Sequence, residues 1–177
     1  MDAALTRRHV LLVGLPGAGK TTVGRRAATL LGAPFADLDE VVAARAGKSV
    51  PRLFAEDGEP AFRDLEAEAG AELLAGPPQL LAPGGGYLTD EARRRRALEN
   101  GLVIYLKTTP SIAARRLVGQ DQRPLLKGYE PALRLKQLLE RREAAYLEAH
   151  ETVTTDGRTA DQVAEAVAKL ARARAGW

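Results

Sequence analysis

The sequence predicts an α/β fold built on a parallel sheet. Short apolar segments typical of buried strands alternate along the chain with longer segments whose apolar residues recur at helical spacing. In addition, a glycine-rich loop follows the first apolar segment and leads directly into the first helical segment. A strand, a loop and a helix in this order form the usual entry to a parallel α/β sheet.

The predicted elements follow one another without internal repeats or low-complexity linkers. Strands are expected at His9–Gly14, Phe35–Leu38, Gln79–Ala82, Leu102–Leu106 and, more weakly, Thr152–Thr155. Helices are expected at Lys20–Leu31, Asp39–Ala46, Pro60–Ala75, Asp90–Glu99, Ser111–Val118, Leu133–Ala149 and Ala160–Arg174.

Two segments interrupt this alternation. Gly47–Glu59 is interpreted as a turn-rich insertion with a short apolar patch at Leu53 and Phe54. Gly119–Tyr129 is polar, lies between two predicted helices and has the composition of a mobile flap, although an ordinary connecting loop is the alternative.

Composition limits the classes of protein to consider. With 177 residues the chain is expected to form one domain, residues 1–177, and the absence of cysteine excludes disulfides and thiol chemistry. No apolar run is long enough for a membrane span, and residues 1–9 lack the apolar core of a secretory signal, so we expect a cytoplasmic protein. The net charge of +3 does not call for nucleic acid, and we see no apolar stripe that would indicate an oligomer, so a monomer is expected.

Arginine and histidine residues outside the motifs are given structural roles. The run Arg93–Arg96 occupies four consecutive helical positions that point all round the axis, so it is interpreted as a solvated surface. His9 and His150 are isolated and lack the spacing of metal ligands.

The loop Gly14–Thr21 fits the phosphate-binding pattern G-x-x-x-x-G-K-S/T. Its glycines allow backbone N–H groups to approach phosphate oxygens, and the N-terminus of the following helix favours the anion. Lys20 supplies a positive charge for the β- and γ-phosphates, and the Thr21 hydroxyl is placed to ligate Mg²⁺. The alternative, a plain glycine-rich turn, does not account for the flanking strand and helix.

Two carboxylates close the second predicted strand. Asp37 and Asp39 are two residues apart, so in a strand both side chains would point toward the edge of the sheet where ligands bind. One could serve the Mg²⁺ shell and the other a substrate hydroxyl. Helix capping could explain one of the two acids.

Two further motifs suit an anionic small molecule. Arg63 lies near the expected N-terminus of a helix, where a cation is unfavourable, so either an anionic substrate or an ion pair with Glu59 or Glu66 accounts for it. Gly84, Gly85 and Gly86 follow a strand and would let the main chain approach a ligand closely, although a tight turn is the alternative.

The second half of the chain adds two basic positions. Arg123 lies in the predicted flap, and an arginine delivered by a closing loop often accelerates phosphoryl transfer. Arg142 and Tyr146 are four residues apart and therefore share one face of a helix.

Taken together, these motifs resemble the shikimate kinases, a family in the nucleoside-monophosphate-kinase-like branch of P-loop proteins. The resemblance extends from Val10 to about Leu170, with the motifs in the family's order and spacing. It implies a three-layer αβα fold with a central five-stranded parallel sheet, a substrate-binding insertion at about residues 38–65 and a lid loop at about residues 119–129. The implied reaction transfers the γ-phosphoryl of ATP, with Mg²⁺, to the 3-hydroxyl of shikimate.

The resemblance also assigns roles by motif. Asp39 would bind shikimate hydroxyls and accept the proton, Asp37 would support the Mg²⁺ shell, and Arg63 and Arg142 would hold the shikimate carboxylate beside the three glycines. Arg123 would contact the transferring phosphoryl group. The nucleotide would lie against Gly17, Ala18, Gly19, Lys20, Thr21, Thr22, Arg116 and Arg158.

The chain departs from the family pattern at two places. Ala82-Pro83 replaces the Ser or Thr that usually precedes the three glycines, so a hydroxyl near the metal is missing, and Tyr87 follows where a small residue is common. A related kinase for gluconate or another polyol acid is the alternative enzyme, and a nucleotide-dependent switch without turnover is the alternative outside the enzymes.

Overall fold

One parallel sheet organises the chain, which was analysed as a computed structural model that describes residues 6–118 and 130–177. The strand order is β2-β3-β1-β4-β5, and all neighbouring strands are parallel. In the register of the sheet, Val10 of the central strand lies opposite Leu80 on one side and Leu102 on the other. The strands are β1 (His9–Val13), β2 (Phe35–Asp37), β3 (Leu80–Ala82), β4 (Gly101–Lys107) and β5 (Glu151–Thr154).

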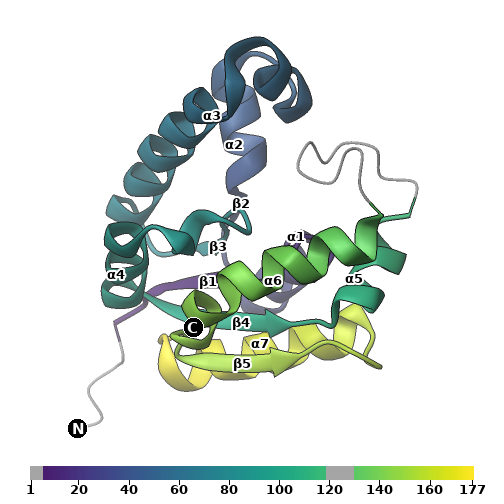
Figure 1. Ribbon diagram of the computed structural model, residues 1–177. Coiled ribbons are helices and arrows are strands. Elements are labelled where there is room, and N and C mark those ends of the chain that lie inside the picture. Colours follow the sequence, from purple (N-terminus) through teal and green to yellow (C-terminus); the bar gives the residue numbers. More distant parts are fainter. Residues whose placement is uncertain (1–5, 119–129) are drawn as a thin grey trace, which may run out of the picture.

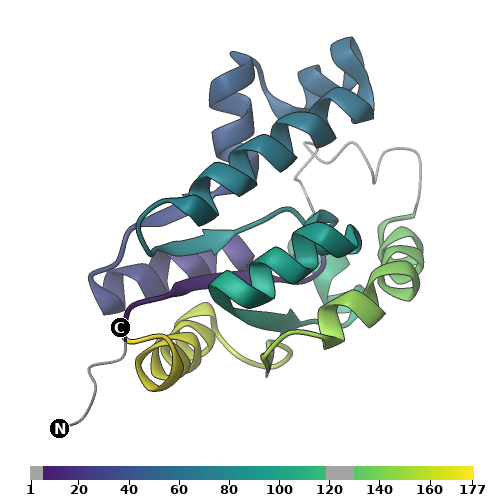
Figure 2. The ribbon, with the colours of Figure 1, turned by 90° about the vertical axis from the view of Figure 1, so that its left-hand side faces the viewer.

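Helices cover both faces of the sheet, which gives three layers (Figures 1 and 2). Val10 and Leu12 of β1 point to one face and Leu11 and Val13 to the other, because side chains alternate along a strand, and all four are buried. The first face packs against α1 (Lys20–Leu31) and α7 (Ala160–Arg174). The second packs against α3 (Val50–Ala75), α4 (Glu91–Asn100), α5 (Pro110–Arg116) and α6 (Pro131–Leu147). The predicted αβα fold is confirmed.

The segment between α2 (Leu38–Ala46) and the second half of α3 corrects the sequence interpretation. Gly47–Glu59 is not a turn-rich insertion, because helix α3 already begins at Val50. Ser49 caps this helix by accepting a hydrogen bond from the Arg52 N–H, and the apolar residues Leu53 and Phe54 lie on its inner side.

A kink at Gly58 divides α3 into two segments and explains why only its second half was predicted. Gly58 has φ 85° and ψ 167°, a conformation that a side chain would strain. Pro60 follows in the first turn of the second segment, as expected from its sequence position. The kink brings the rings of Phe54 and Phe62 to a centroid separation of 4.8 Å. In Figures 1 and 2 this part of α3 and α2 stand together above the sheet.

Several smaller boundaries also differ from the prediction. Leu38 belongs to helix α2 instead of strand β2, and β3 begins one residue later than expected, at Leu80. Helix α5 ends at Arg116, with Leu117 as its C-cap, and a short 3₁₀ turn, η1 (Tyr87–Thr89), follows the three glycines. The expected flap, Gly119–Tyr129, lies outside the described residues.

The two histidines are structural, as predicted. The Nδ1 of His9 accepts a hydrogen bond from the Gln79 N–H at 3.3 Å, and the Nδ1 of His150 accepts one from the Val103 N–H at 3.0 Å. Burial lowers the pKa of both side chains below the ordinary value for histidine. Both imidazoles therefore act as neutral acceptors that tie loops to the sheet.

Candidate active site

A cavity of about 1040 Å³ opens at the carboxyl ends of the strands. In open α/β sheets this edge is where ligands bind. The cavity is lined by every sequence-predicted site residue that the structure describes: Gly17, Ala18, Gly19, Lys20, Thr21, Thr22, Asp37, Asp39, Arg63, Gly84, Gly85, Gly86, Arg116, Arg142 and Arg158. The structure thus brings together residues from β2, α1, α2, α3, α5, α6 and the loops after β1, β3 and β5.

The glycine-rich loop curls over the N-terminus of α1. Gly19 is the N-cap of this helix and adopts a left-handed conformation with φ 91°. The Lys20 Nζ donates hydrogen bonds to the carbonyl oxygens of Gly14 and Leu15, each at 2.8 Å, so its charge is held over the loop. This arrangement places a positive charge and a helix N-terminus at the same end of the cavity, which is suited to a polyphosphate.

Asp37 connects the loop to helix α2. Its Oδ2 accepts a short hydrogen bond from the Thr21 hydroxyl, and its Oδ1 caps α2 by accepting from the Asp39 N–H at 2.9 Å and the Glu40 N–H at 3.3 Å. A hydroxyl and a carboxylate in contact, with the remaining positions left to water and phosphate, fit the way Mg²⁺ is held in phosphotransferases. Thr21 and Asp37 could therefore hold the ion.

The reason given for pairing Asp37 with Asp39 was wrong, although both line the cavity. The strand ends at Asp37, and Asp39 lies in the first turn of α2, so strand alternation does not align them. Helix capping, the alternative for one of the two acids, is made by Asp37. The first turn of α2 directs Asp39 toward the glycine loop, where a β-carbon on Gly84 would lie 3.4 Å from its Oδ1.

Two guanidinium groups converge on one point of the cavity wall. A β-carbon built on Gly86 would lie 3.2 Å from Nη2 of Arg142 and 3.3 Å from both Nη1 and Nη2 of Arg63. Arg63 comes from α3 and Arg142 from α6, helices that are far apart in the sequence. Two arginines that meet beside an uncovered main chain suit the binding of a carboxylate.

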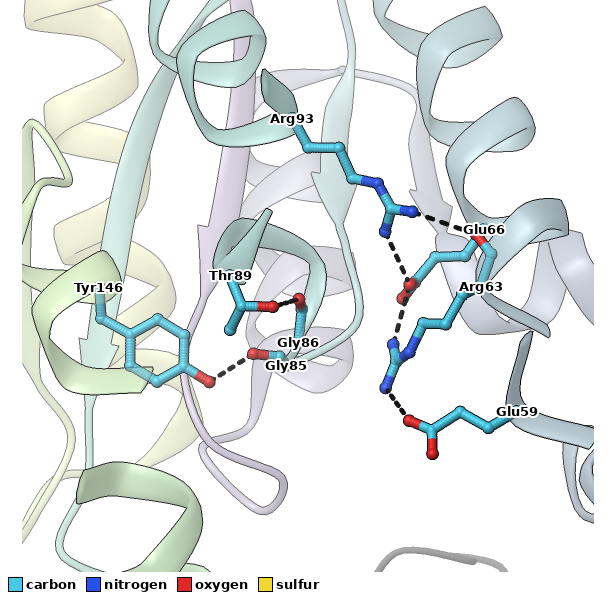
Figure 3. A network of polar contacts seen from close by, with 8 residues as sticks. All are labelled: Glu59, Arg63, Glu66, Gly85, Gly86, Thr89, Arg93 and Tyr146. Carbon is cyan, nitrogen blue, oxygen red and sulfur yellow. Dashed lines mark hydrogen bonds and ion pairs between the residues drawn. The ribbon is translucent and has the colours of Figure 1, made fainter. Parts of the chain in front are cut away.

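Hydrogen bonds fix the loop between these arginines. The Tyr146 hydroxyl donates to the carbonyl oxygen of Gly85 at 2.5 Å, and the Thr89 hydroxyl donates to that of Gly86 at 2.6 Å (Figure 3). Tyr146 is buried, and burial raises the pKa of its hydroxyl, so it remains a donor. The loop is thus held in place without using the Arg63 or Arg142 charge.

Arg63 is paired with two carboxylates, as the alternative interpretation of its sequence position allowed. Its Nη1 donates to Glu66 Oε2 at 2.9 Å and its Nη2 to Glu59 Oε1 at 3.3 Å. Burial alone would lower the pKa of Arg63, but the two carboxylates outweigh it and raise the pKa above the ordinary value. The side chain therefore stays charged and is oriented toward the cavity.

Arg116 and Arg158 lie at the other end of the cavity, near the glycine-rich loop. Arg116 donates to Thr155 Oγ1 at 3.0 Å, to the Thr155 carbonyl at 3.3 Å and to the Gly17 carbonyl at 3.4 Å. Arg158 is exposed and donates to the backbone carbonyls of Thr154 and Gln162. Arg123 lies outside the described residues.

Sequence reasoning gave two charged residues of this region no place in the cavity. Glu66 was named only as a possible ion-pair partner of Arg63, three residues away, but it is fully buried and lines the cavity. Arg93 contacts Glu66 and the main chain of Arg63, so the arginine run is not simply a solvated surface. Arg94 is also partly covered and binds Glu148 and the Leu88 carbonyl, whereas Arg95 and Arg96 are exposed as predicted.

Comparison with known proteins identifies the family of this chain. The family model described as shikimate kinase matches residues 16–172. The chain belongs to the shikimate kinase family. It is 45% identical over 153 residues to a shikimate kinase of Caulobacter vibrioides, which covers 86% of this chain and 76% of that protein. It is also 45% identical over 165 residues to one of Thermobifida fusca, which covers 93% of this chain and 95% of that protein.

Solved structures agree with this family. A shikimate kinase from Acinetobacter baumannii in complex with shikimate superposes with a TM-score of 0.91 at 36% identity, over 97% of each chain. A gluconokinase from Sinorhizobium meliloti has a TM-score of 0.64 at 16% identity, over 97% of this chain and 95% of that one, so it shares the fold alone. Among the described residues, no helix has the length and apolar character needed to cross a membrane.

Proposed function

We propose that this protein transfers the γ-phosphoryl group of ATP to the 3-hydroxyl of shikimate, giving shikimate 3-phosphate and ADP. Membership of the shikimate kinase family supports the reaction. The convergence of Arg63 and Arg142 at Gly86, in a cavity that the glycine-rich loop also lines, is the observation that carries the proposal. The same cavity thus offers a site suited to a carboxylate and a site suited to phosphates.

The acid substrate is proposed to lie between these two sites. Arg63 and Arg142 bind its carboxylate, and the main chain of Gly84, Gly85 and Gly86 closes the pocket beside it. Asp39 accepts hydrogen bonds from the ring hydroxyls and takes the proton of the attacking hydroxyl as the phosphoryl group is transferred. Residues of about 38–65 thus form the acid-binding part of a single domain, 1–177.

The nucleotide is proposed to occupy the loop end of the cavity. Gly17, Ala18, Gly19, Lys20, Thr21 and Thr22 enclose its phosphates, which the Lys20 ammonium binds, while Arg116 and Arg158 line the base side. Thr21 and Asp37 hold Mg²⁺, which when bound neutralises charge on the phosphate oxygens. Because phosphoryl transfer needs little covalent chemistry from the protein, positioning and electrostatic stabilisation provide the catalysis. Arg123, proposed from the sequence to contact the transferring group, would complete this end.

The missing hydroxyl before the three glycines is expected to affect the Mg²⁺ site and not the binding of the acid substrate. Ala82 and Pro83 line the cavity where the family usually has Ser or Thr. We infer that the Mg²⁺ shell depends on Thr21 and Asp37 to a greater extent here.

A coupled assay of ADP release tests the proposal. Shikimate, gluconate and other hydroxy acids are compared as acceptors, with and without Mg²⁺. We expect turnover with shikimate that needs Mg²⁺ and little turnover with gluconate. Faster turnover with gluconate would favour the alternative kinase, and nucleotide binding without turnover on any acid would favour a switch.

A further inference from the structure

A buried carboxylate lies directly behind the two-arginine site. Glu66 is fully buried, its Oε2 accepts a hydrogen bond from Arg63 Nη1 at 2.9 Å, and its Oε1 has no hydrogen-bond partner within the described part of the chain. A buried carboxylate needs compensating positive charge. If Arg63 alone supplied this positive charge, its ion pair with Glu66 would greatly weaken its attraction for a substrate carboxylate.

Arg93 supplies a second positive charge to the same carboxylate. From the first turns of α4 its Nη1 reaches Glu66 Oε2 at 3.4 Å, and its Nη2 donates to the Arg63 carbonyl oxygen at 3.3 Å (Figure 3). Its side chain is only 22% exposed. Because Arg63 is also bound to Glu59, the cluster holds two carboxylates, and without Arg93 it would carry a net negative charge beside the proposed carboxylate site.

The surroundings of Arg93 hold it in this position. Its guanidinium lies 5.6 Å from the centroid of the Tyr87 ring, a cation–π contact, and Tyr87 is buried. The Tyr87 hydroxyl occupies space left by Gly70, where a β-carbon would lie 2.4 Å from the phenolic oxygen.

Arg93 is absent from the cavity lining, whereas Arg63 and Glu66 both line it, in the part of the chain that the structure describes. Arg93 must therefore act through these two residues and not by contact with the substrate.

We propose that Arg93 is a positioning residue for the acid substrate: it neutralises buried Glu66 from behind and so leaves the charge of the Arg63 guanidinium available for the substrate carboxylate. This inference rests on the proposed function, because it names shikimate as the acid. It assigns part of the carboxylate affinity to a residue that does not touch the substrate.

The substitution Arg93→Gln tests the proposal, with Arg95→Gln as the matched control. Arg95 lies on the same helix, loses the same charge and is exposed. In the coupled assay we expect the KM for shikimate to rise about tenfold in Arg93→Gln, which corresponds to about 1.4 kcal/mol. The KM for ATP and kcat should stay within about twofold, since a general loss of structure would change all three constants. Arg95→Gln should leave all three unchanged.

The variant Glu66→Gln provides a second background, in which an effect of Arg93→Gln on substrate positioning can be separated from an effect on folding. In Glu66→Gln the buried charge is gone, so adding Arg93→Gln should change the KM for shikimate by less than about twofold. The double variant buries no unpaired carboxylate and is expected to fold even where Arg93→Gln alone does not. Calorimetric binding of shikimate without ATP provides the same comparison independently of turnover.

The outcomes are distinguishable. If the unaltered protein phosphorylates shikimate but Arg93→Gln has the KM of Arg95→Gln, this inference alone is wrong. It is also wrong if Arg93→Gln raises the KM severalfold in the Glu66→Gln background. An unaltered protein that releases no ADP with shikimate would overturn the proposed function itself.

Discussion

Replacing Gly86 by alanine adds one methyl group at the point where the two arginines meet. The added β-carbon would lie 3.2 Å from Arg142 Nη2 and 3.3 Å from both terminal nitrogens of Arg63, closer than ordinary van der Waals contact. The backbone of Gly86 has φ −94° and ψ −1°, which alanine adopts without strain. The substitution therefore affects the carboxylate site and not the fold.

The expected rise in the KM for shikimate follows from the hydrogen bonds that the two arginines are proposed to make to the substrate carboxylate. Both guanidinium groups must give way by a few tenths of an ångström, and the methyl group occupies space beside the substrate carboxylate. A hydrogen bond to a charged group contributes about 1.5–3 kcal/mol, so losing the geometry of one such bond should raise the KM for shikimate by about 10-fold to 100-fold. The KM for ATP should change little, because the three nearest atoms to the added β-carbon belong to Arg142 and Arg63 and not to the glycine-rich loop.

The assay is the coupled measurement of ADP release, with shikimate and ATP varied separately and the melting temperature recorded for each variant. Gly76→Ala is the matched control, since Gly76 caps α3 and a β-carbon there meets only ordinary contacts at 3.5 Å and beyond. A Gly86→Ala protein whose KM for shikimate equals that of the control would refute the carboxylate site.

Three other predictions address separate parts of the account. Arg63→Ala should mainly weaken shikimate binding, seen as a raised KM, whereas Arg123→Ala should lower kcat by about 10³-fold or more with a smaller effect on the KM; wild-type kinetics for both would remove these roles. Asp37→Asn keeps the helix cap, because asparagine caps as well as aspartate, but it should raise the Mg²⁺ concentration for half-maximal rate by about tenfold or more; an unchanged Mg²⁺ titration would contradict this. Because burial lowers the pKa of His9 and His150 in the folded state, the unfolded chain takes up protons first as the pH falls below about 6.5. Stability should therefore decrease between about pH 6.5 and 5, and His9→Asn with His150→Asn should flatten that decrease in denaturant titrations, whereas an identical slope would show that other groups cause it.

Local patterns were enough to predict the sheet and the glycine-rich loop at the N-terminus of α1. The apolar segment before Gly14 and the helical spacing after Lys20 determine their own structure, because a buried strand and a helix N-terminus need those residue types. The same holds for the three glycines after β3, whose lack of side chains is visible in the sequence.

The sequence predictions were wrong where contacts between distant parts of the chain determine the structure. The composition of Gly47–Glu59 suggested a turn-rich insertion, but Ser49 caps a helix within it and Leu53 packs into the core, so the chain kinks within α3 and does not loop. Arg93 looked solvated because four consecutive arginines cannot share one face, yet its own position faces buried Glu66 on another helix. No spacing rule links residues 66 and 93, so only the packing of α4 against α3 reveals the contact.

The position of the transferred phosphate on the product tests the central claim most directly. After reaction of the unaltered protein with ATP, Mg²⁺ and shikimate, correlation of the phosphorus and proton NMR signals identifies the esterified oxygen. The account predicts a single product in which phosphorus couples to the proton on carbon 3. A phosphate on another hydroxyl, or ADP formed with free phosphate and unmodified shikimate, would contradict it.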